Sequence, residues 1–247
     1  MSWALDLDGV VWLGNEIIPG VPNAISRIRR SGERVFFVTN ASAKPVSQVE
    51  KKLLSFGIEP DGGVITSAMA VVLLLEHGER VLPLCGDGAI EEMKKAGVQI
   101  VQDGHIDSVV VGLDEDFNYW KLAAALKAID SGARLVATND DLIYPAHDGI
   151  RPGAGSILAP LVAATGVTPE VAGKPHQPMC DLLSGNADEN GIMVGDRPDT
   201  DGLFAKNMGW DFALVLSGVT NESDLPVEPP HDLLAEHLPD LVEKVIG

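Results

Sequence analysis

The chain has 247 residues, of which 45% are hydrophobic and 5% aromatic, and its 36 acidic and 18 basic residues give a formal net charge of −18. This length accommodates one large domain or two modest ones. Because a strongly acidic protein is repelled by nucleic acid and by anionic membranes, we expect neither as a partner. No basic and apolar leader begins the chain and no apolar run is long enough for a membrane span, so we expect a cytoplasmic protein.

Strand and helix patterns alternate from the first residues onward. Strands are predicted in the run that ends at Asp8 and at 34–40, 80–84, 108–112, 134–138, 191–195 and 212–216. Helical patterns run from Val21 to Gly32, from Pro45 to Gly57, over 118–130 and over 154–164. This alternation predicts a mostly parallel sheet with helices on its faces.

The spacing of the predicted strands is uneven. The first two strands and the last two have the pattern of core strands in a doubly wound sheet. Between them, the segment 79–172 contains helices and strands of its own and is long enough to form a compact unit. We therefore predict an α/β fold: a doubly wound, Rossmann-like parallel-sheet core formed by 1–78 and 173–247, with an inserted α/β domain over 79–172.

Polar residues capable of chemistry fall at the ends of predicted strands or just before helices. They are Asp6 with Asp8, Thr39 with Asn40, Lys174, and Asp196 with Asp201. Because the carboxyl ends of parallel strands lie at one edge of a sheet, we expect these side chains to converge. Several carboxylates in one place repel one another unless one is protonated or a cation lies among them. An oxygen-only set with few protein ligands suits Mg²⁺.

This ordered set of motifs resembles the signature of the haloacid dehalogenase-like phosphohydrolases. That signature contains a DxDG segment, a strand-end Thr or Ser, a Lys and an acidic GDxxxTD segment, and the corresponding stretches here read DLDGV, FFVTN, GKP and GDRPDTD. The stretches VVVGLDEDFNYWKL, ATNDDLIYP and RPGAGS are similar to the large C2-type cap domain of the NagD-like, p-nitrophenylphosphatase branch. The resemblance covers essentially the whole chain and implies that 79–172 is a cap.

The resemblance implies a Mg²⁺-dependent phosphatase that hydrolyses small phosphate monoesters through an aspartyl-phosphate. Asp6 would be the nucleophile, and Asp8 would protonate the leaving group and then activate water. Lys174 would neutralise charge on the nucleophile and on the phosphoryl group. Thr39 and the backbone N–H that follows it, that of Asn40, would hold the phosphoryl oxygens.

The resemblance also implies a set of metal ligands. Asp6, the main-chain carbonyl of Asp8 and Asp196 would bind Mg²⁺, and Asp201 would orient these ligands. The expected partner is a small phosphorylated metabolite, such as a sugar phosphate, glycerol phosphate, phosphoglycolate or a nucleotide, and the sequence does not choose among them. A homodimer formed through the cap is expected as well.

The cap should supply substrate specificity. Its polar candidates for substrate contact are Asn139, Asp140, Asp141 and His147. Two other functions stay open at this point: a phosphotransferase or mutase on the same scaffold, and a phospho-accepting, receiver-like signalling protein. Related mutases carry a helical cap just after the first motif, where only the 30 residues 9–38 separate Asp8 from Thr39 here. Receiver domains are much shorter and lack a second Asp two places after the nucleophile.

Overall fold

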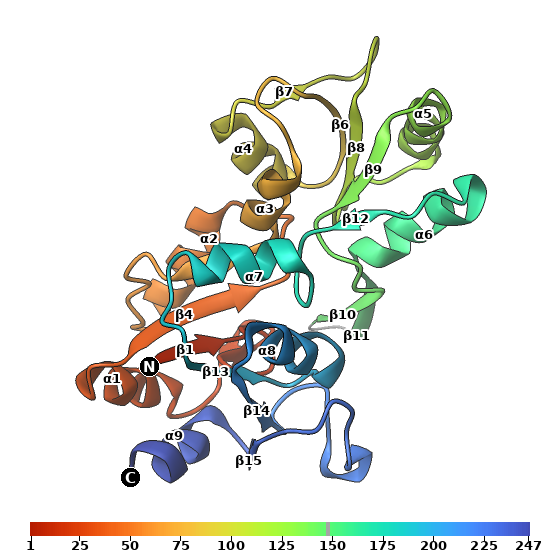
Figure 1. The fold of residues 1–247 in the computed structure, drawn as a ribbon. Coiled ribbons are helices and arrows are strands. Elements are labelled where there is room, and N and C mark those ends of the chain that lie inside the picture. Colours follow the sequence, from red (N-terminus) through yellow and green to blue (C-terminus); the bar gives the residue numbers. More distant parts are fainter. Residues whose placement is uncertain (147–148) are drawn as a thin grey trace. The chain divides into compact units, whose positions relative to one another are not determined.

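The computed structural model describes residues 1–146 and 149–247 (Figure 1). The candidate substrate contact His147 lies outside the described residues. The chain forms two compact units: residues 1–39, 49–65 and 180–247 make up the first, and residues 40–48 and 66–179 make up the second. None of the helices in the described part of the chain combines the length and the apolar character needed to cross a membrane.

A six-stranded sheet lies at the centre of the first unit. Its order is β15-β14-β13-β1-β4-β5. The strands are β1 (Ser2–Leu5), β4 (Arg34–Thr39), β5 (Val64–Thr66), β13 (Gly191–Gly195), β14 (Asp211–Val215) and β15 (Leu233–Ala235). β1 runs parallel to both of its neighbours, β4 and β13. The chain builds the sheet outward from β1 in one direction and from β13 in the other, so the carboxyl ends of β1 and β13 form a topological switch point.

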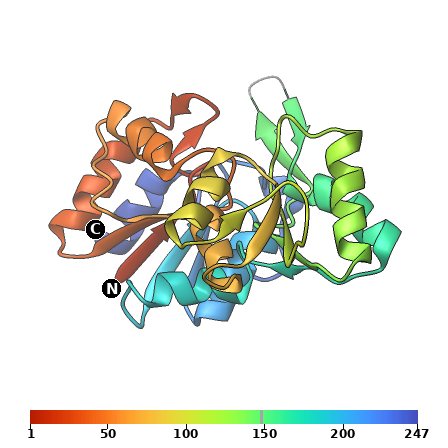
Figure 2. The ribbon, with the colours of Figure 1, turned by 90° about the horizontal axis from the view of Figure 1, so that it is seen from above.

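The central strands are apolar because both of their faces are covered. Every residue of β1 and of β13 is buried, and in β4 only the first residue is exposed. The helix α1 (Val21–Arg30) buries the apolar stripe of its sequence and is followed by Gly32, whose φ of 84° favours glycine. α1 packs beside α9 (Leu238–Ile246), as Figure 2 shows.

The remaining elements of the first unit are short. They are the antiparallel pair β2 (Trp12–Leu13) and β3 (Glu16–Ile17), the π-helical turn η2 (Pro198–Gly202), α8 (Leu203–Met208) and the 3₁₀ turn η3 (Glu222–Asp224). Two helices, α2 (Val46–Ser55) and α7 (Gln177–Ser184), contribute residues to both units.

The second unit has a parallel sheet of its own. Its order is β12-β9-β8-β6-β7, and all of its recorded strand pairs are parallel. The strands are β6 (Arg80–Leu84), β7 (Gln99–Ile100), β8 (Ser108–Val111), β9 (Arg134–Ala137) and β12 (Glu170–Val171). The helices are α3 (Ser67–Ala70), η1 (Val71–Leu74), α4 (Asp87–Lys95), α5 (Tyr119–Asp130) and α6 (Ala154–Thr165). An antiparallel hairpin, β10 (Ile143–Ala146) with β11 (Gly149–Pro152), completes the unit.

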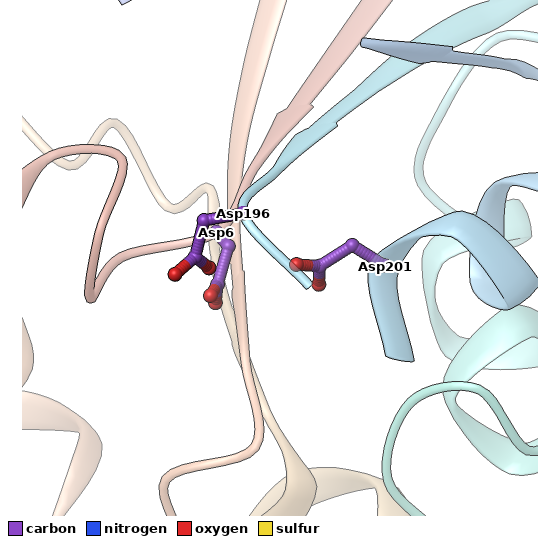
Figure 3. A group of neighbouring side chains, drawn as sticks. All are labelled: Asp6, Asp196 and Asp201. Carbon is purple, nitrogen blue, oxygen red and sulfur yellow. The ribbon is translucent and has the colours of Figure 1, made fainter. Parts of the chain in front are cut away.

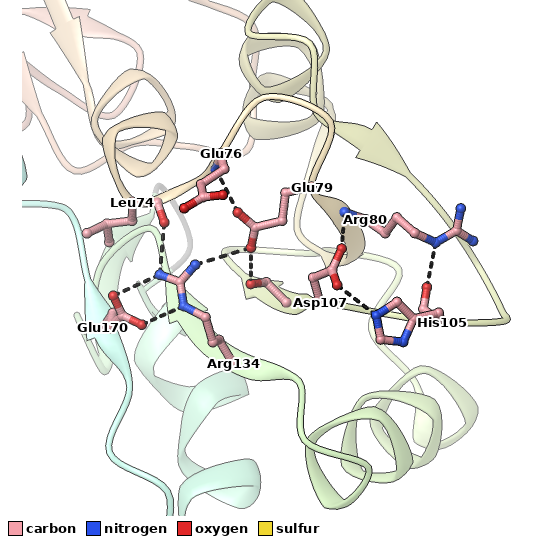
Figure 4. Close-up of polar contacts among 9 residues, drawn as sticks. Leu74, Glu76, Glu79, Arg80, His105, Asp107, Arg134 and Glu170 are labelled. Carbon is pink, nitrogen blue, oxygen red and sulfur yellow. Dashed lines mark hydrogen bonds and ion pairs between the residues drawn. The ribbon is translucent and has the colours of Figure 1, made fainter.

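The core of the second unit lies between this sheet and two helices. α5 and α6 pack against each other and against β8. Their apolar residues form one buried cluster with the strands, which includes Leu84, Val109, Leu135, Ile157 and Leu161. The amino ends of the strands are joined by a polar network around Arg134, in which the guanidinium lies between Glu79 and Glu170 (Figure 4).

The predicted fold class is confirmed: the chain has an α/β fold with a Rossmann-like parallel sheet. The long helices and the central strands of both sheets lie within one or two residues of their predicted ranges, except that β1 ends at Leu5, three residues before the predicted end at Asp8. The two-residue strands, the hairpin β10–β11, the edge strands β5 and β15, the helices α3, α4, α7 and α8 and the turn η1 were not predicted. The limits proposed for the inserted domain, 79–172, stay a prediction; the second unit also takes in 40–48, 66–78 and 173–179.

Candidate active site

Three carboxylates from separate segments meet at the carboxyl edge of the first unit's sheet (Figure 3). Asp6 directly follows β1, Asp196 directly follows β13, and Asp201 lies in the turn η2. One oxygen from each carboxylate lies within 4.8 Å of one oxygen from each of the other two. Asp196 and Asp201 are buried and Asp6 is half-buried. The structure therefore brings together three of the residues that the sequence nominated for a metal site.

Asp196 is held by the loop that follows β14. The backbone N–H of Val219 donates to Asp196 Oδ2 at 2.6 Å, and the hydroxyl of Thr220 donates to the main-chain oxygen of Asp196 at 2.6 Å. Gly218 and Gly9 lie directly against the carboxylate, so that a Cβ atom built on either residue would collide with it. These two glycines admit the carboxylate because they have no side chain.

Asp201 is held from its own turn. The backbone N–H of Arg197 donates to Asp201 Oδ2 at 3.2 Å, and the N–H of Asp201 donates to the carbonyl of Arg197 at 2.8 Å. A Cβ atom on Gly195, the last residue of β13, would collide with the Asp201 carboxylate. The sequence GDRPDTD thus folds back on itself and presents both of its buried aspartates at one place.

The donor set fits a hard divalent cation. Two carboxylates about 4 Å apart repel by about 4 kcal/mol at an effective dielectric constant of about 20. Asp196 and Asp201 are at most 2% exposed, so water screens them poorly. A cation among the three would replace repulsion by attraction, and carboxylate oxygens are the ligands that Mg²⁺ and Ca²⁺ prefer.

Asp8 lies two residues beyond Asp6 but has a different environment. It is exposed, and its Oδ1 accepts a hydrogen bond of 2.9 Å from the indole Nε1 of Trp12. Its carboxylate is not a member of the group of three, and the prediction assigned only its main-chain carbonyl to the metal. Trp12 was not among the residues predicted from the sequence, and its place in the stretch DLDGVVW, four residues after Asp8, was the available signal.

Thr39 is the last residue of β4 in the first unit. It is 4% exposed. Because Leu5 pairs with Phe37 across β1 and β4, Thr39 and Asp6 both follow these paired residues toward the carboxyl edge. Thr39 therefore ends its strand at the same edge as the three carboxylates.

Asn40 and Lys174 belong to the second unit and contact each other there. Asn40 Oδ1 accepts from the backbone N–H of Lys174 at 2.7 Å, and Asn40 Nδ2 donates to the carbonyl of Lys174 at 3.0 Å. Asn40 Nδ2 also donates to Asp141 Oδ2 at 2.9 Å. The side chain of Asn40 thus holds the backbone of Lys174, whose side chain is buried. The role that was predicted for Asn40 concerned its backbone N–H.

The candidate substrate contacts Asn139, Asp140 and Asp141 have partners within the second unit. Asn139 is buried, and its Nδ2 donates to the main-chain oxygen of Asn40 at 2.8 Å. The backbone N–H of Asp141 donates to Asn139 Oδ1 at 3.2 Å. Asp140 is exposed and lies 3.2 Å from the Nε2 atom of His176. Asn139 and Asp141 therefore organise the loop after β9 around Asn40.

Two family patterns match the chain. One is described as haloacid dehalogenase-like hydrolase and matches residues 3–99, and the other is described as HAD-hydrolase-like and matches residues 171–241. The acid sugar phosphatase of Staphylococcus aureus is 35% identical over 233 residues, which make up 91% of this chain and 89% of that protein.

Solved structures of phosphatases also resemble this chain over nearly its whole length. The p-nitrophenyl phosphatase from Archaeoglobus fulgidus superposes with a TM-score of 0.90 at 30% identity, over 99% of this chain and 98% of that one. The glycerol phosphate phosphatase from Mycobacterium tuberculosis in complex with magnesium gives a TM-score of 0.89 at 32% identity, over 97% of this chain and 75% of that one. The same enzyme has also been solved in complex with calcium. The resemblance is thereby confirmed: the chain belongs to the haloacid dehalogenase-like hydrolases, as a phosphatase of their NagD-like, p-nitrophenylphosphatase branch.

Proposed function

We propose that this protein is a Mg²⁺-dependent phosphatase that hydrolyses small phosphate monoesters through an aspartyl-phosphate intermediate. The observation that carries the proposal is the cluster of Asp6, Asp196 and Asp201 at the switch point of the sheet. The names of the relatives support the substrate class, since they are an acid sugar phosphatase, a glycerol phosphate phosphatase and a p-nitrophenyl phosphatase. A location in the cytoplasm belongs to the same proposal.

The metal proposed is Mg²⁺. Asp6, the main-chain carbonyl of Asp8 and Asp196 would hold it, and Asp201 would orient these ligands. When bound, the ion would neutralise charge on the phosphoryl oxygens and on the nucleophile. The carboxylate donor set and the magnesium complex of the related glycerol phosphate phosphatase both support this choice.

Two aspartates carry the covalent chemistry in this proposal. A carboxylate oxygen of Asp6 attacks phosphorus and forms an O–P bond, while the bond from phosphorus to the leaving oxygen breaks and that oxygen keeps the electron pair. Asp8 gives its proton to the leaving oxygen, and the alcohol departs. Asp8 then takes a proton from water, whose oxygen attacks phosphorus. The Asp6–phosphorus bond breaks, and inorganic phosphate is released.

Three further residues complete the proposed site. Thr39, at the end of β4, and the backbone N–H of Asn40 would bind phosphoryl oxygens. Lys174 would neutralise negative charge on the nucleophile and on the phosphoryl group, an assignment that rests on the resemblance. The substrate would be a small phosphorylated metabolite, with the residues of 79–172 acting as a cap that supplies specificity.

The test is phosphate release from p-nitrophenyl phosphate in the presence of Mg²⁺ and after EDTA. Activity should depend on the metal, and Asp6→Asn should abolish it while the protein stays folded, because the amide is not a nucleophile. Asp211→Asn is the matched control: Asp211 is exposed and begins β14, at the opposite edge of the same sheet. Absence of hydrolysis from the wild-type protein across a broad panel of phosphate esters would refute the proposal.

The two alternative functions give different results in the same assay. A phosphotransferase or mutase would pass the phosphoryl group to an added sugar in preference to water. A receiver-like protein would form a phosphoprotein from acetyl phosphate that persists for minutes.

A further inference from the structure

The carboxylate of Asp8 is held by a buried indole. Trp12 is 3% exposed, and its Nε1 donates to Asp8 Oδ1 at 2.9 Å. The backbones of the two residues also form an isolated β-bridge. Asp8 is exposed, and an exposed carboxylate ordinarily samples several rotamers. The hydrogen bond from a buried ring therefore restricts a side chain that the solvent alone would leave mobile.

Trp12 is itself fixed from several sides. The ammonium group of Lys52 lies 3.8 Å from the centroid of the Trp12 ring and donates to the carbonyl of Gly14 at 2.7 Å. The ring of Phe56 lies 6.1 Å from that of Trp12, centroid to centroid. The backbone N–H of Trp12 donates to the carbonyl of Leu7 at 3.1 Å. A cation over the face of an indole is attracted to the ring, so Lys52 stabilises the position of Trp12 as well.

Other indoles in the chain have partners away from the carboxylate cluster. Trp3 donates to Glu33 Oε2 at 2.5 Å, and Trp210 donates to the carbonyl of Glu189 at 3.0 Å. Trp3 is fully buried in β1 and binds a carboxylate, as Trp12 does. Glu33 directly precedes β4 and lies at the amino edge of the sheet. Trp3 is therefore a matched control for Trp12.

We propose that Trp12 is a positioning residue that orients Asp8 for proton transfer to the leaving oxygen. The inference rests on the proposed function, in which Asp8 donates this proton while the bond from phosphorus to the leaving oxygen breaks. Proton transfer in a transition state requires the acid to be held in the correct orientation. The contacts of Lys52, Phe56 and Leu7 with Trp12 make the indole a rigid support for that orientation.

The proposal predicts a dependence on the leaving group. p-Nitrophenolate is a good leaving group and departs with little help from an acid, whereas the phenolate of phenyl phosphate needs the proton more. Trp12→Phe keeps an aromatic ring beneath Lys52 and beside Phe56 but removes the N–H donor. The variant should therefore lose more kcat/KM on phenyl phosphate than on p-nitrophenyl phosphate.

The experiment measures kcat/KM on both substrates, with Mg²⁺, for wild type, Trp12→Phe and Trp3→Phe. In Trp12→Phe, we expect the ratio of kcat/KM on phenyl phosphate to kcat/KM on p-nitrophenyl phosphate to fall about tenfold. This loss is a part of the ~10²- to 10⁴-fold rate enhancement that a general acid contributes. It should stay unchanged in Trp3→Phe. Because both substrates are assayed on one preparation, any unfolded fraction cancels in the ratio, and a purely structural defect leaves the ratio unaltered.

Two outcomes would overturn the inference while wild type remains active. One is an equal loss on both substrates, or no loss at all, in Trp12→Phe. The other is a fall of the same size in Trp3→Phe, which would mean that any buried indole has this effect. A wild-type protein that hydrolyses neither ester with Mg²⁺ present would instead refute the proposed function, and with it the basis of the inference.

Discussion

At the scale of single residues, the carboxylate cluster depends on glycines that leave room for it. Gly218 is the clearest case, because a Cβ atom there would overlap the buried carboxylate of Asp196. Asp196 also accepts from the neighbouring Val219, so it cannot move aside without losing that hydrogen bond. The identity of a residue with no chemistry of its own thus controls the position of a proposed metal ligand.

Gly218→Ala should therefore displace the Asp196 carboxylate. We expect at least a tenfold rise in the Mg²⁺ concentration needed for half-maximal phosphatase activity, measured by metal titration. The control is Gly185→Ala, since a Cβ atom on Gly185 would have its nearest neighbour at 3.6 Å, an ordinary contact. If both variants needed the same Mg²⁺ concentration for half-maximal activity, the loop around Gly218 would have to adapt without weakening metal binding, which would contradict this prediction.

The two cysteines give a second prediction at this scale. Burial raises the pKa of the Cys85 thiol from 9.0 to about 12 and that of Cys180 to about 11. A raised pKa keeps both thiols neutral at pH 8, and only the thiolate reacts readily. By linkage, the contribution of the two neutral thiols to the free energy of unfolding is fully present below pH 9. It is lost as the pH rises through the folded-state pKa values.

A thiol reagent such as a disulfide dye should therefore react slowly with the native protein at pH 8. Both cysteines are free, so two equivalents should be titrated rapidly after unfolding in urea. Rapid reaction of either thiol in the native state would show that its surroundings open on the timescale of the assay.

At the scale of elements, Arg134 joins the amino ends of several segments in the second unit (Figure 4). It begins β9, binds Glu170 of β12 through two hydrogen bonds of 2.9 Å, and donates to Glu79 at 3.2 Å and to the carbonyl of Leu74 at 2.9 Å. The paired carboxylate of Glu170, followed by Glu79, holds the pKa of Arg134 above its usual value. This fork geometry suits Arg and not Lys.

Replacing Arg134 by Met should destabilise the second unit by about 1–2 kcal/mol, because its side chain is 40% exposed and water screens part of the interaction. Urea unfolding with and without added salt measures this loss. Lys95→Met is the control: Lys95 pairs with Glu91 and Glu92 on the exposed surface of α4, where water screens the ion pairs and they contribute little to stability. Equal losses in the two variants would contradict a bracing role for Arg134.

The elements also differ in how far the sequence predicts them. α1 and α5 have ten and twelve residues, enough turns for an apolar period or a terminating residue such as Gly32 to be recognised. β2, β3, β7 and β12 have two residues each, and two residues carry no period. Such strands exist only because a neighbouring strand or turn offers hydrogen bonds, so their prediction requires the tertiary structure.

At the scale of the whole molecule, the homodimer expected from the resemblance stays a prediction. The second unit exposes two aromatic side chains at the start of α5: Tyr119 is 70% exposed and Trp120 78% exposed, with their rings 5.3 Å apart, centroid to centroid. Large exposed aromatic groups of this kind are favoured in interfaces. They lie within the segment predicted to be the cap.

Light scattering should therefore give a mass of twice 26.1 kDa, and Trp120→Ser should shift the protein toward the monomer. Leu54→Ser, which removes an exposed apolar side chain from the first unit, should leave the mass unchanged. A monomeric wild type at micromolar concentration would contradict the expected dimer.

The sequence by itself determined the fold class, the long helices and the central strands of both sheets, and the identities of the chemical groups. Apolar period and capping residues are local signals, and the four ordered motifs identify the family that the comparisons confirm. It also nominated Asp6, Asp196 and Asp201, because residues that follow parallel strands lie at one edge of the sheet.

Only the tertiary structure decided which of those groups touch. The spacing of the three carboxylates within 4.8 Å depends on strand register and on the close approach of Gly218 and Gly195, which no local pattern encodes. The bond from Trp12 to Asp8 depends on a turn of four residues and on Lys52, which lies forty positions beyond Trp12. Distances between side chains are set by packing among distant segments, whereas periodicity records only which face of its own helix or strand a residue occupies.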